Sequence, residues 1–216
     1  MILAVAPDPL AHGWWLASRA AGVVALLLVT ASTLLGLAMA TRPHGGARRR
    51  AAQLVTLHEQ LALTGLVAIA VHGITLLGDP WLRPGLAGIA LPGAMTYRPL
   101  FTSLGIVAGW LVALLGLSYY LRAHLGVSRW RAVHRFTLLA YALAVVHTLG
   151  GGTDAGSTWL RWPLLGSCAL VLLLLARRLA RRDPATRKGL PLDDMPTPIP
   201  APRRRRPPVP AARRVS

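Results

Sequence analysis

The chain has 216 residues, of which 54% are hydrophobic, with a mean hydropathy of +0.49 and a formal net charge of +17 at pH 7. This composition is too apolar for an ordinary soluble domain and is typical of an integral membrane protein. The single cysteine, Cys168, excludes a disulfide framework.

Five apolar stretches are candidates for membrane-spanning helices, at roughly 14–40, 52–77, 101–121, 133–149 and 159–176. About 20 helical residues cross a hydrocarbon core of about 30 Å, so all five stretches are long enough to span it, and the fourth is the shortest. The first is expected to be a retained helix, because no basic region precedes it and its apolar run exceeds that of a cleaved signal. The sequence thus predicts an all-α, polytopic membrane bundle of five transmembrane helices with a disordered C-terminal tail.

The basic residues are distributed unevenly along the chain. Half of the 24 follow residue 176, and most of the others lie in two short loops, 41–50 and 121–135. The alternate loops, around 78–100 and 150–158, hold few basic residues and contain Asp79 and Asp154. This asymmetry predicts a multi-pass protein of the cell membrane with its N-terminus outside and its C-terminus in the cytoplasm. It accounts for the positive charge without nucleic acid, and anionic lipid is the expected partner of the tail.

Three regions follow from these patterns. Residues 1–13 are expected to form a short extracytoplasmic N-terminus, 14–178 the transmembrane domain, and 179–216 a cytoplasmic tail. The tail is rich in Pro and Arg and has almost no aromatic or branched apolar residues to bury. Such a segment cannot form a core and is expected to be disordered.

Four of the seven histidines fall inside predicted spans, where an imidazole is costly unless something binds it. They are His58 and His72 in the second span and His134 and His147 in the fourth, whereas His12, His44 and His124 lie in the N-terminal segment or the loops. The first two are 14 residues apart and project from nearly the same helix face. The other two are 13 residues apart, which on an ideal helix turns one ring well off the face of the other. That spacing requires local overwinding, a bend, or partners approached from different directions.

The second and fourth spans run in the same direction, so their like ends lie together. His58 is therefore expected to meet His134 near the cytoplasmic face, and His72 to meet His147 near the outer face. Each pair offers two axial imidazoles to one flat iron macrocycle, an arrangement that suits electron transfer better than oxygen binding. Two matched pairs favour haem over interhelical hydrogen bonding, a proton relay or zinc, which normally takes three or four compact ligands.

The pairs H-x13-H and H-x12-H, on two parallel helices separated by one helix, resemble the ferric-reductase-like transmembrane domain. That family includes ferric reductases, NADPH oxidases and the haem-binding subunit of the periplasmic methionine sulfoxide reductase system. The stretches "SRAAGVVALLL" (18–28), "LHEQLALTGLVAIAVHGITLL" (57–77) and "SRWRAVHRFTLLAYALAVVHTLGGGTD" (128–154) are similar to its small actinobacterial members. The resemblance covers roughly residues 14–178. It implies two b-type haems, the inner with iron ligands His58 and His134 and the outer with His72 and His147.

The chain departs from the larger relatives, which have six helices and a C-terminal flavin and nicotinamide domain. Its tail is too short for such a domain, and "LGGGTD" fits no glycine-rich phosphate-binding fingerprint. We therefore expect no flavin or NAD(P) on this chain. A cytoplasmic-side flavoprotein reductase or a quinol is the expected electron donor, and an extracytoplasmic protein or small molecule the expected acceptor.

Four arginines are candidates to bind haem propionates, which need cations or hydrogen-bond donors in a low-dielectric setting. Arg19 and Arg98 lie near the outer ends of the first and third spans, and Arg131 and Arg135 flank His134. Snorkelling to the membrane interface explains the same four residues equally well.

Trp130 and Tyr141 are candidates to line a haem face, with an interfacial belt as the other explanation for Trp130. Glu59, next to His58, is expected at the inner boundary, and Thr153 and Asp154 on the outer side, at an acceptor site or in a simple turn. Five glycines give small surfaces for a macrocycle or, more commonly, a neighbouring helix: Gly65, Gly73, Gly105, Gly109 and Gly116.

The expected function is transmembrane electron transfer through two b-type haems, as the membrane subunit of a reductase. Whether the chain is an enzyme by itself stays open. One haem instead of two is a variant, since the 13-residue spacing leaves one site's geometry open. The alternatives are a non-redox membrane scaffold, with helix-bridging histidines and a partner-recruiting tail, and a single-haem handling or sensing protein.

Overall fold

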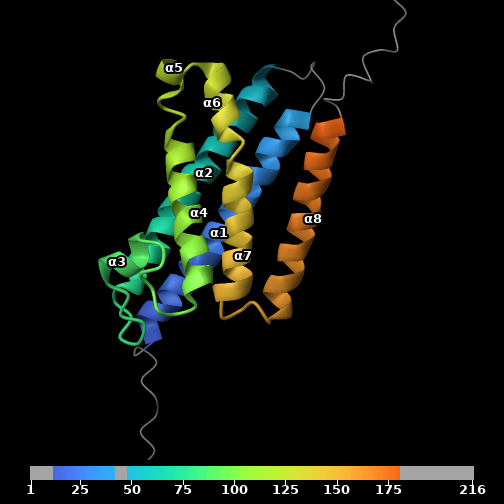
Figure 1. Ribbon diagram of the computed structural model, residues 1–216. Coiled ribbons are helices and arrows are strands. Elements are labelled where there is room, and N and C mark those ends of the chain that lie inside the picture. The colour runs from blue at the N-terminus through green and yellow to red at the C-terminus, as the bar shows by residue number, and fades with distance from the viewer. Residues whose placement is uncertain (1–11, 42–47, 181–216) are drawn as a thin grey trace, which may run out of the picture. The chain divides into compact units, whose positions relative to one another are not determined.

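The computed structural model describes residues 12–41 and 48–180, and every regular element in these ranges is a helix (Figure 1). The helices are α1 (Gly13–Thr41), α2 (Arg48–Leu76), α3 (Gly85–Ala90), α4 (Pro99–Leu117), α5 (Arg122–Leu125), α6 (Val127–His134), α7 (Thr137–Gly151) and α8 (Thr158–Ala180). The described residues exclude almost all of the N-terminal segment and of the tail. The prediction of a disordered tail therefore falls outside them.

Five stretches of the described chain are long and apolar enough to cross a membrane. They are Gly13–Thr41, Arg49–Leu76, Pro99–Leu117, Val127–Gly151 and Thr158–Ala180. Helices are the expected form for such stretches, because a helix satisfies every backbone polar group within itself where lipid offers no partner. The prediction of an all-α, five-span membrane bundle is therefore confirmed. Figure 1 shows α5 and α6 at one end of this bundle and α3 at the other.

The fourth span is interrupted between α6 and α7. The backbone N–H of Phe136 bonds the Val133 carbonyl at 3.0 Å, and that of Leu138 bonds the Arg135 carbonyl at 3.3 Å. These bonds join residues three apart, so the chain turns more tightly here than an α-helix does. Tighter turning adds rotation per residue, and local overwinding is one of the three ways in which the 13-residue histidine spacing can be accommodated.

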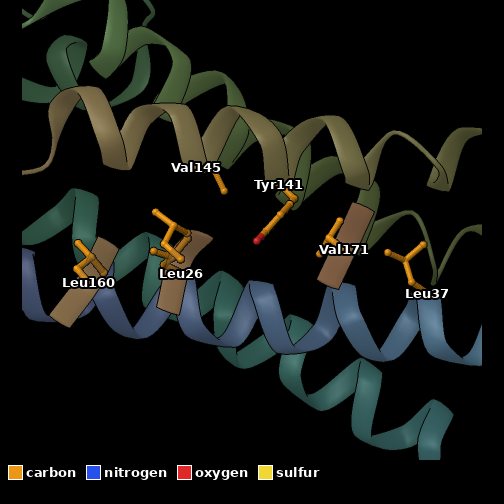
Figure 2. Packing of buried hydrophobic residues seen from close by; sticks show 7 residues of the cluster. Leu26, Leu37, Tyr141, Val145, Leu160 and Val171 are labelled. Atoms are coloured by element: carbon orange, nitrogen blue, oxygen red, sulfur yellow. The ribbon is translucent and has the colours of Figure 1, made fainter. Parts of the chain in front are cut away.

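The helices pack as two pairs, α1 against α2 and α4 against α7, while α8 lies against α1. An apolar cluster joins α1, α7 and α8, as Figure 2 shows. Its buried members are Leu26, Leu37, Tyr141, Val145, Leu160, Leu164 and Val171. No comparable packing joins α2 to α7 in the described chain. Helix α2, which carries His58 and His72, and helix α7, which carries His147, therefore pack mainly against other helices.

Candidate functional site

The four intramembrane histidines meet as two pairs, in the combination that the sequence predicts. His72 of α2 and His147 of α7 have ring centres 6.4 Å apart with an interplanar angle of 70°. His58 of α2 and His134, the last residue of α6, have ring centres 6.3 Å apart at 86°. We call the first the cavity pair, for the cavity that surrounds it, and the second the helix-break pair, for its place beside the α6–α7 interruption.

The ring separation excludes a direct hydrogen bond between the two imidazoles of a pair and is compatible with a shared metal. Two imidazoles joined by a hydrogen bond have ring centres at most about 5.8 Å apart, since the nitrogens must lie within about 3.5 Å of each other. Two imidazoles that bind one metal from opposite sides have ring centres about 6.4 Å apart, because each metal–nitrogen bond is about 2 Å long and each nitrogen lies about 1.2 Å from its ring centre. The observed values of 6.4 and 6.3 Å exclude the hydrogen bond and are compatible with a shared metal, as they are with two rings packed edge to face.

Helix α1 holds His72 on the side away from its partner. The Nδ1 of His72 lies 2.8 Å from the Ser18 carbonyl and 3.0 Å from the Ser18 hydroxyl, which also donates to the His72 carbonyl at 2.9 Å. Gly22 lies one turn further along α1, where a Cβ would come within 3.0 Å of the same Nδ1. A side chain at residue 22 would therefore displace the ring by a few tenths of an ångström.

Helix α1 holds His58 in the same way. The Nδ1 of His58 lies 2.9 Å from the Ser32 carbonyl and 3.0 Å from the Ser32 hydroxyl. At Gly36, again one turn further along, a Cβ would lie 3.1 Å from Cε1 of the ring. The two α2 histidines thus have equivalent surroundings on α1.

Helix α4 holds His147 with a closer fit still. The Nδ1 of His147 donates to the Phe101 carbonyl at 2.8 Å. A Cβ at Gly105 would lie 2.5 Å from that nitrogen, a distance that real atoms do not adopt, so His147 has its place only if residue 105 is glycine.

His134 lacks an equivalent hydrogen bond. Its Nδ1 is buried without a partner of acceptable geometry in the described chain, although the Leu115 carbonyl of α4 lies beside it. Its ring stacks instead on Trp130, with ring centres 4.9 Å apart and an interplanar angle of 28°. The Trp130 indole N–H donates to the Ser118 hydroxyl at 3.2 Å, which fixes the stacked ring.

A cavity of about 900 Å³ encloses the cavity pair. Its walls come from α1, α2, α4, α7 and the loops after α2 and α7, and they are mostly apolar, with Arg19, Asp79 and Asp154 among the few charged groups. Ligand pockets typically have volumes of about 300–1,000 Å³. The cavity does not extend to the helix-break pair.

These features fit haem ligation by histidine pairs. Both pairs have the required ring separation, and none of the four Nε2 atoms makes a hydrogen bond to the described chain, which leaves each available as a ligand. No three His, Cys, Asp or Glu side chains gather within residues 12–41 and 48–180. Each pair thus offers two histidines, whereas zinc normally takes three or four ligands.

Arg19 lies at the mouth of the cavity, where its guanidinium makes two hydrogen bonds to the Asp154 carboxylate and lies over the Trp15 ring, 5.2 Å from its centre. Asp154 is buried and Arg19 half-buried. The pair links α1 to the loop after α7. Thr153, from the same loop, also lines the cavity.

The other three arginines lie differently. Arg98 precedes α4, donates to the Gly150 carbonyl and lies over the Tyr97 ring, and it does not line the cavity. Arg131 and Arg135 are exposed beside the helix-break pair. Arg98 thus ties α4 to the end of α7.

The aromatic and acidic candidates separate into different surroundings. Tyr141 lies in the α1–α7–α8 cluster, with its hydroxyl 3.2 Å from that of Ser167, away from the cavity. Glu59 accepts a hydrogen bond of 3.0 Å from the hydroxyl of Tyr120, in the loop after α4. That bond raises the pKa of the Tyr120 phenol above its ordinary value.

The five glycine candidates also differ. Gly65 packs against Leu28 and Val29 of α1, and Gly109 against Ile69 of α2, which is helix packing. Gly105 accommodates the ring of His147. A Cβ at Gly73 or Gly116 would meet nothing within 4 Å.

The residues of α1 that contact the histidines are not among the site residues expected from the sequence. Serine recurs at 18 and 32 and glycine at 22 and 36, each 14 residues apart, which is the spacing of the two histidines of α2. This repeated S-x3-G pattern on the preceding antiparallel helix is a signal from which they could have been found.

Comparisons of the chain with protein-family models, with curated proteins and with solved structures found no match.

Proposed function

We propose that this protein carries electrons across the cell membrane through b-type haems held by its two histidine pairs. The observation that carries the proposal is the ring separation, 6.4 Å in one pair and 6.3 Å in the other. Two axial imidazoles on one iron need this separation, and histidines bonded directly to each other cannot reach it. The resemblance of the histidine pattern to the ferric-reductase-like transmembrane domain supports the same function.

The chain's own residues have distinct tasks in this proposal. His72 and His147 would hold an outer haem, and His58 and His134 an inner one. The cavity walls are mostly apolar, and a low-dielectric surrounding helps to set the reduction potential of a haem. When bound, each haem supplies an iron that accepts and gives up one electron.

The direction of transfer follows from the proposed orientation. Basic residues gather in the 41–50 and 121–135 loops and after residue 176, which favours a cytoplasmic location for the end that holds the helix-break pair. A cytoplasmic flavoprotein or a quinol would then donate to the inner haem, and an extracytoplasmic protein or small molecule would accept from the outer one. The protein would act as the membrane subunit of a reductase.

A single-haem version of this function has one specific observation in its favour. The cavity of about 900 Å³ encloses only the cavity pair. If one pair alone binds haem, we expect it to be His72 and His147, and the protein would then handle or sense haem instead of conducting electrons across the whole bilayer.

The test is a reduced-minus-oxidised visible spectrum of the purified full-length chain, with pyridine haemochrome quantification. We expect two b-type haems per chain, and a loss of about one in His72→Ala and of about one in His134→Ala. His124→Ala is the matched control, because this histidine is exposed in α5 and belongs to neither pair. A chain that binds no haem after expression with ample haem would contradict the proposal and leave a scaffold whose histidines bridge helices through Nδ1.

A further inference from the structure

Helix α1 contains two copies of one small element, Ser18-x3-Gly22 and Ser32-x3-Gly36. The 14-residue interval between the copies equals the interval between His58 and His72 on α2. Because α1 and α2 are antiparallel and closely packed, each copy meets one histidine, as the hydrogen bonds of Ser18 and Ser32 show.

The contacts decide which ring nitrogen carries the proton. A backbone carbonyl oxygen can only accept a hydrogen bond, so the Nδ1 atoms that lie 2.8 and 2.9 Å from the Ser18 and Ser32 carbonyls must be the donors. A neutral imidazole has one N–H, and Nε2 of both rings therefore presents a lone pair. Nε2 is also the nitrogen that α1 leaves without a contact. The tautomer that a metal requires is thus already selected by α1.

The serine hydroxyls hold the histidines in addition to the backbone carbonyls. Ser18 is 2% exposed and Ser32 is 6% exposed, and a hydroxyl buried this deeply is costly unless it is hydrogen-bonded. Each hydroxyl lies 3.0 Å from the Nδ1 of its histidine and donates to the backbone carbonyl of the same residue, at 2.9 Å for His72 and 3.4 Å for His58. One serine therefore contacts both the ring and the backbone of a histidine.

We propose that Ser18 and Ser32 are positioning residues for haem, each of which holds one α2 histidine with its proton on Nδ1 and its Nε2 turned to the iron. This inference rests on the proposed function. Gly22 and Gly36 complete the element by making room for the rings. Each serine acts on a single site: Ser18 on the cavity pair and Ser32 on the helix-break pair.

The experiment uses the full-length, haem-loaded chain and compares Ser18→Ala with Ser32→Ala. The readouts are the midpoint potential of each haem, from an optical redox titration, and the rate at which each haem is lost to apomyoglobin. Spectra of His72→Ala and His134→Ala assign the two components. Ser167→Ala is the matched control, because this serine lies in α8 beside Tyr141 and touches no histidine in the described chain.

We expect each alanine variant to change one haem only. Loss of an acceptor for the Nδ1 proton makes the imidazole a weaker donor to iron, which favours the reduced state and raises the potential. The expected change is about tenfold in the reduction equilibrium, which is about 59 mV for one electron, with a haem loss about tenfold faster from the same site. Threonine at either position keeps the hydroxyl and should restore most of both values.

Two outcomes would overturn the inference. One is that both alanine variants leave both potentials and both loss rates unchanged. The other is that each variant alters both haems equally, which would indicate a general loosening of the bundle. Both outcomes leave the proposed function intact, because the wild-type chain still binds its haems, whereas a wild-type chain without haem would remove the proposed function itself.

Discussion

The two histidine pairs have nearly the same ring separation and very different surroundings. The cavity pair lies in a cavity of about 900 Å³, and both of its Nδ1 atoms are hydrogen-bonded. The helix-break pair lies outside that cavity, and one of its Nδ1 atoms, that of His134, is buried without a partner in the described chain. A stacked tryptophan takes the place of the missing hydrogen bond.

The difference between the two pairs arises from the contacts of α4 and not from those of α1. Helix α1 makes equivalent contacts with His72 and His58, because its serines and glycines repeat at the spacing of the histidines. Helix α4 does not make equivalent contacts with His147 and His134. Phe101 and Leu115 are 14 residues apart, whereas His147 and His134 are 13 apart. The Phe101 carbonyl is hydrogen-bonded to His147, whereas the Leu115 carbonyl lies beside His134 without a hydrogen bond of acceptable geometry.

The distance between the two rings of a pair and the hydrogen bonding of each ring are separate properties. The tighter turn between α6 and α7 lies between His134 and His147, and the two pairs have nearly the same ring separation. The Nδ1 of His134 nevertheless lies beside the Leu115 carbonyl without a hydrogen bond of acceptable geometry. We therefore expect the cavity pair to hold haem more tightly than the helix-break pair.

Gly105→Ala should have the largest effect on this comparison. The new Cβ would lie 2.5 Å from the Nδ1 of His147, on a helix that cannot easily move, so the ring must leave its place. We expect the loss of about one haem per chain, from the cavity pair, with the helix-break haem retained. Haem quantification and the redox titration measure this directly.

Gly116→Ala is the control, since a Cβ there meets nothing within 4 Å and alanine favours a helix by about 1 kcal/mol over glycine. Retention of both haems in Gly105→Ala would show that His147 does not need its present position to bind iron.

Trp130→Leu should weaken the other site. The Trp130 ring is the contact that holds His134, and an aromatic stack is worth about 0.5–1.5 kcal/mol beyond buried area, or about two- to tenfold in affinity. We expect haem loss from the helix-break pair to be faster by about that factor and the cavity pair to be unchanged. Trp130→Phe keeps a stacked ring and should lie close to the wild type; equal loss from both pairs would count against the separate support of the two sites.

Most of the fold and the pairing of the histidines could be predicted from the sequence. The five spans and their all-helical class follow from apolar length alone, and parallel second and fourth spans are enough to match His58 with His134 and His72 with His147. Backbone hydrogen bonds are harder to foresee. Which backbone carbonyls of α4 lie near the histidines depends on the register of α4 against α7. The side chains of Phe101 and Leu115 give no indication of that register.

The surroundings of Tyr141 show another limit. The residue lies on the same span as both histidines, so spacing alone makes it a candidate for the haem face. The structure places it in the apolar cluster with α1 and α8 (Figure 2). Which face of α7 meets α8 depends on the packing of the whole bundle, and one helix's sequence does not contain that information.

Gly22→Ala and Gly36→Ala should have smaller effects, similar in the two sites. The new Cβ atoms would lie 3.0 Å from Nδ1 of His72 and 3.1 Å from Cε1 of His58, so that each ring must move by a few tenths of an ångström. We expect each variant to speed haem loss from its own site by a few-fold, with Gly73→Ala as the control. Unequal effects at the two sites would contradict the inference that α1 makes equivalent contacts with His72 and His58.

Asp154→Asn and Arg19→Gln should have the smallest effect on stability, and together they decide what Arg19 does. The ion pair at the cavity mouth has an arginine side chain that is 36% exposed, so its loss should lower the free energy of unfolding by about 1 kcal/mol or less. If Arg19 serves only to anchor the loop after α7, the two variants should speed haem loss from the cavity pair equally. If Arg19 binds a haem propionate, Arg19→Gln should speed that loss well beyond Asp154→Asn, which leaves the guanidinium in place. The haem of the helix-break pair, at the other end of the span, should be lost at the same rate in both variants.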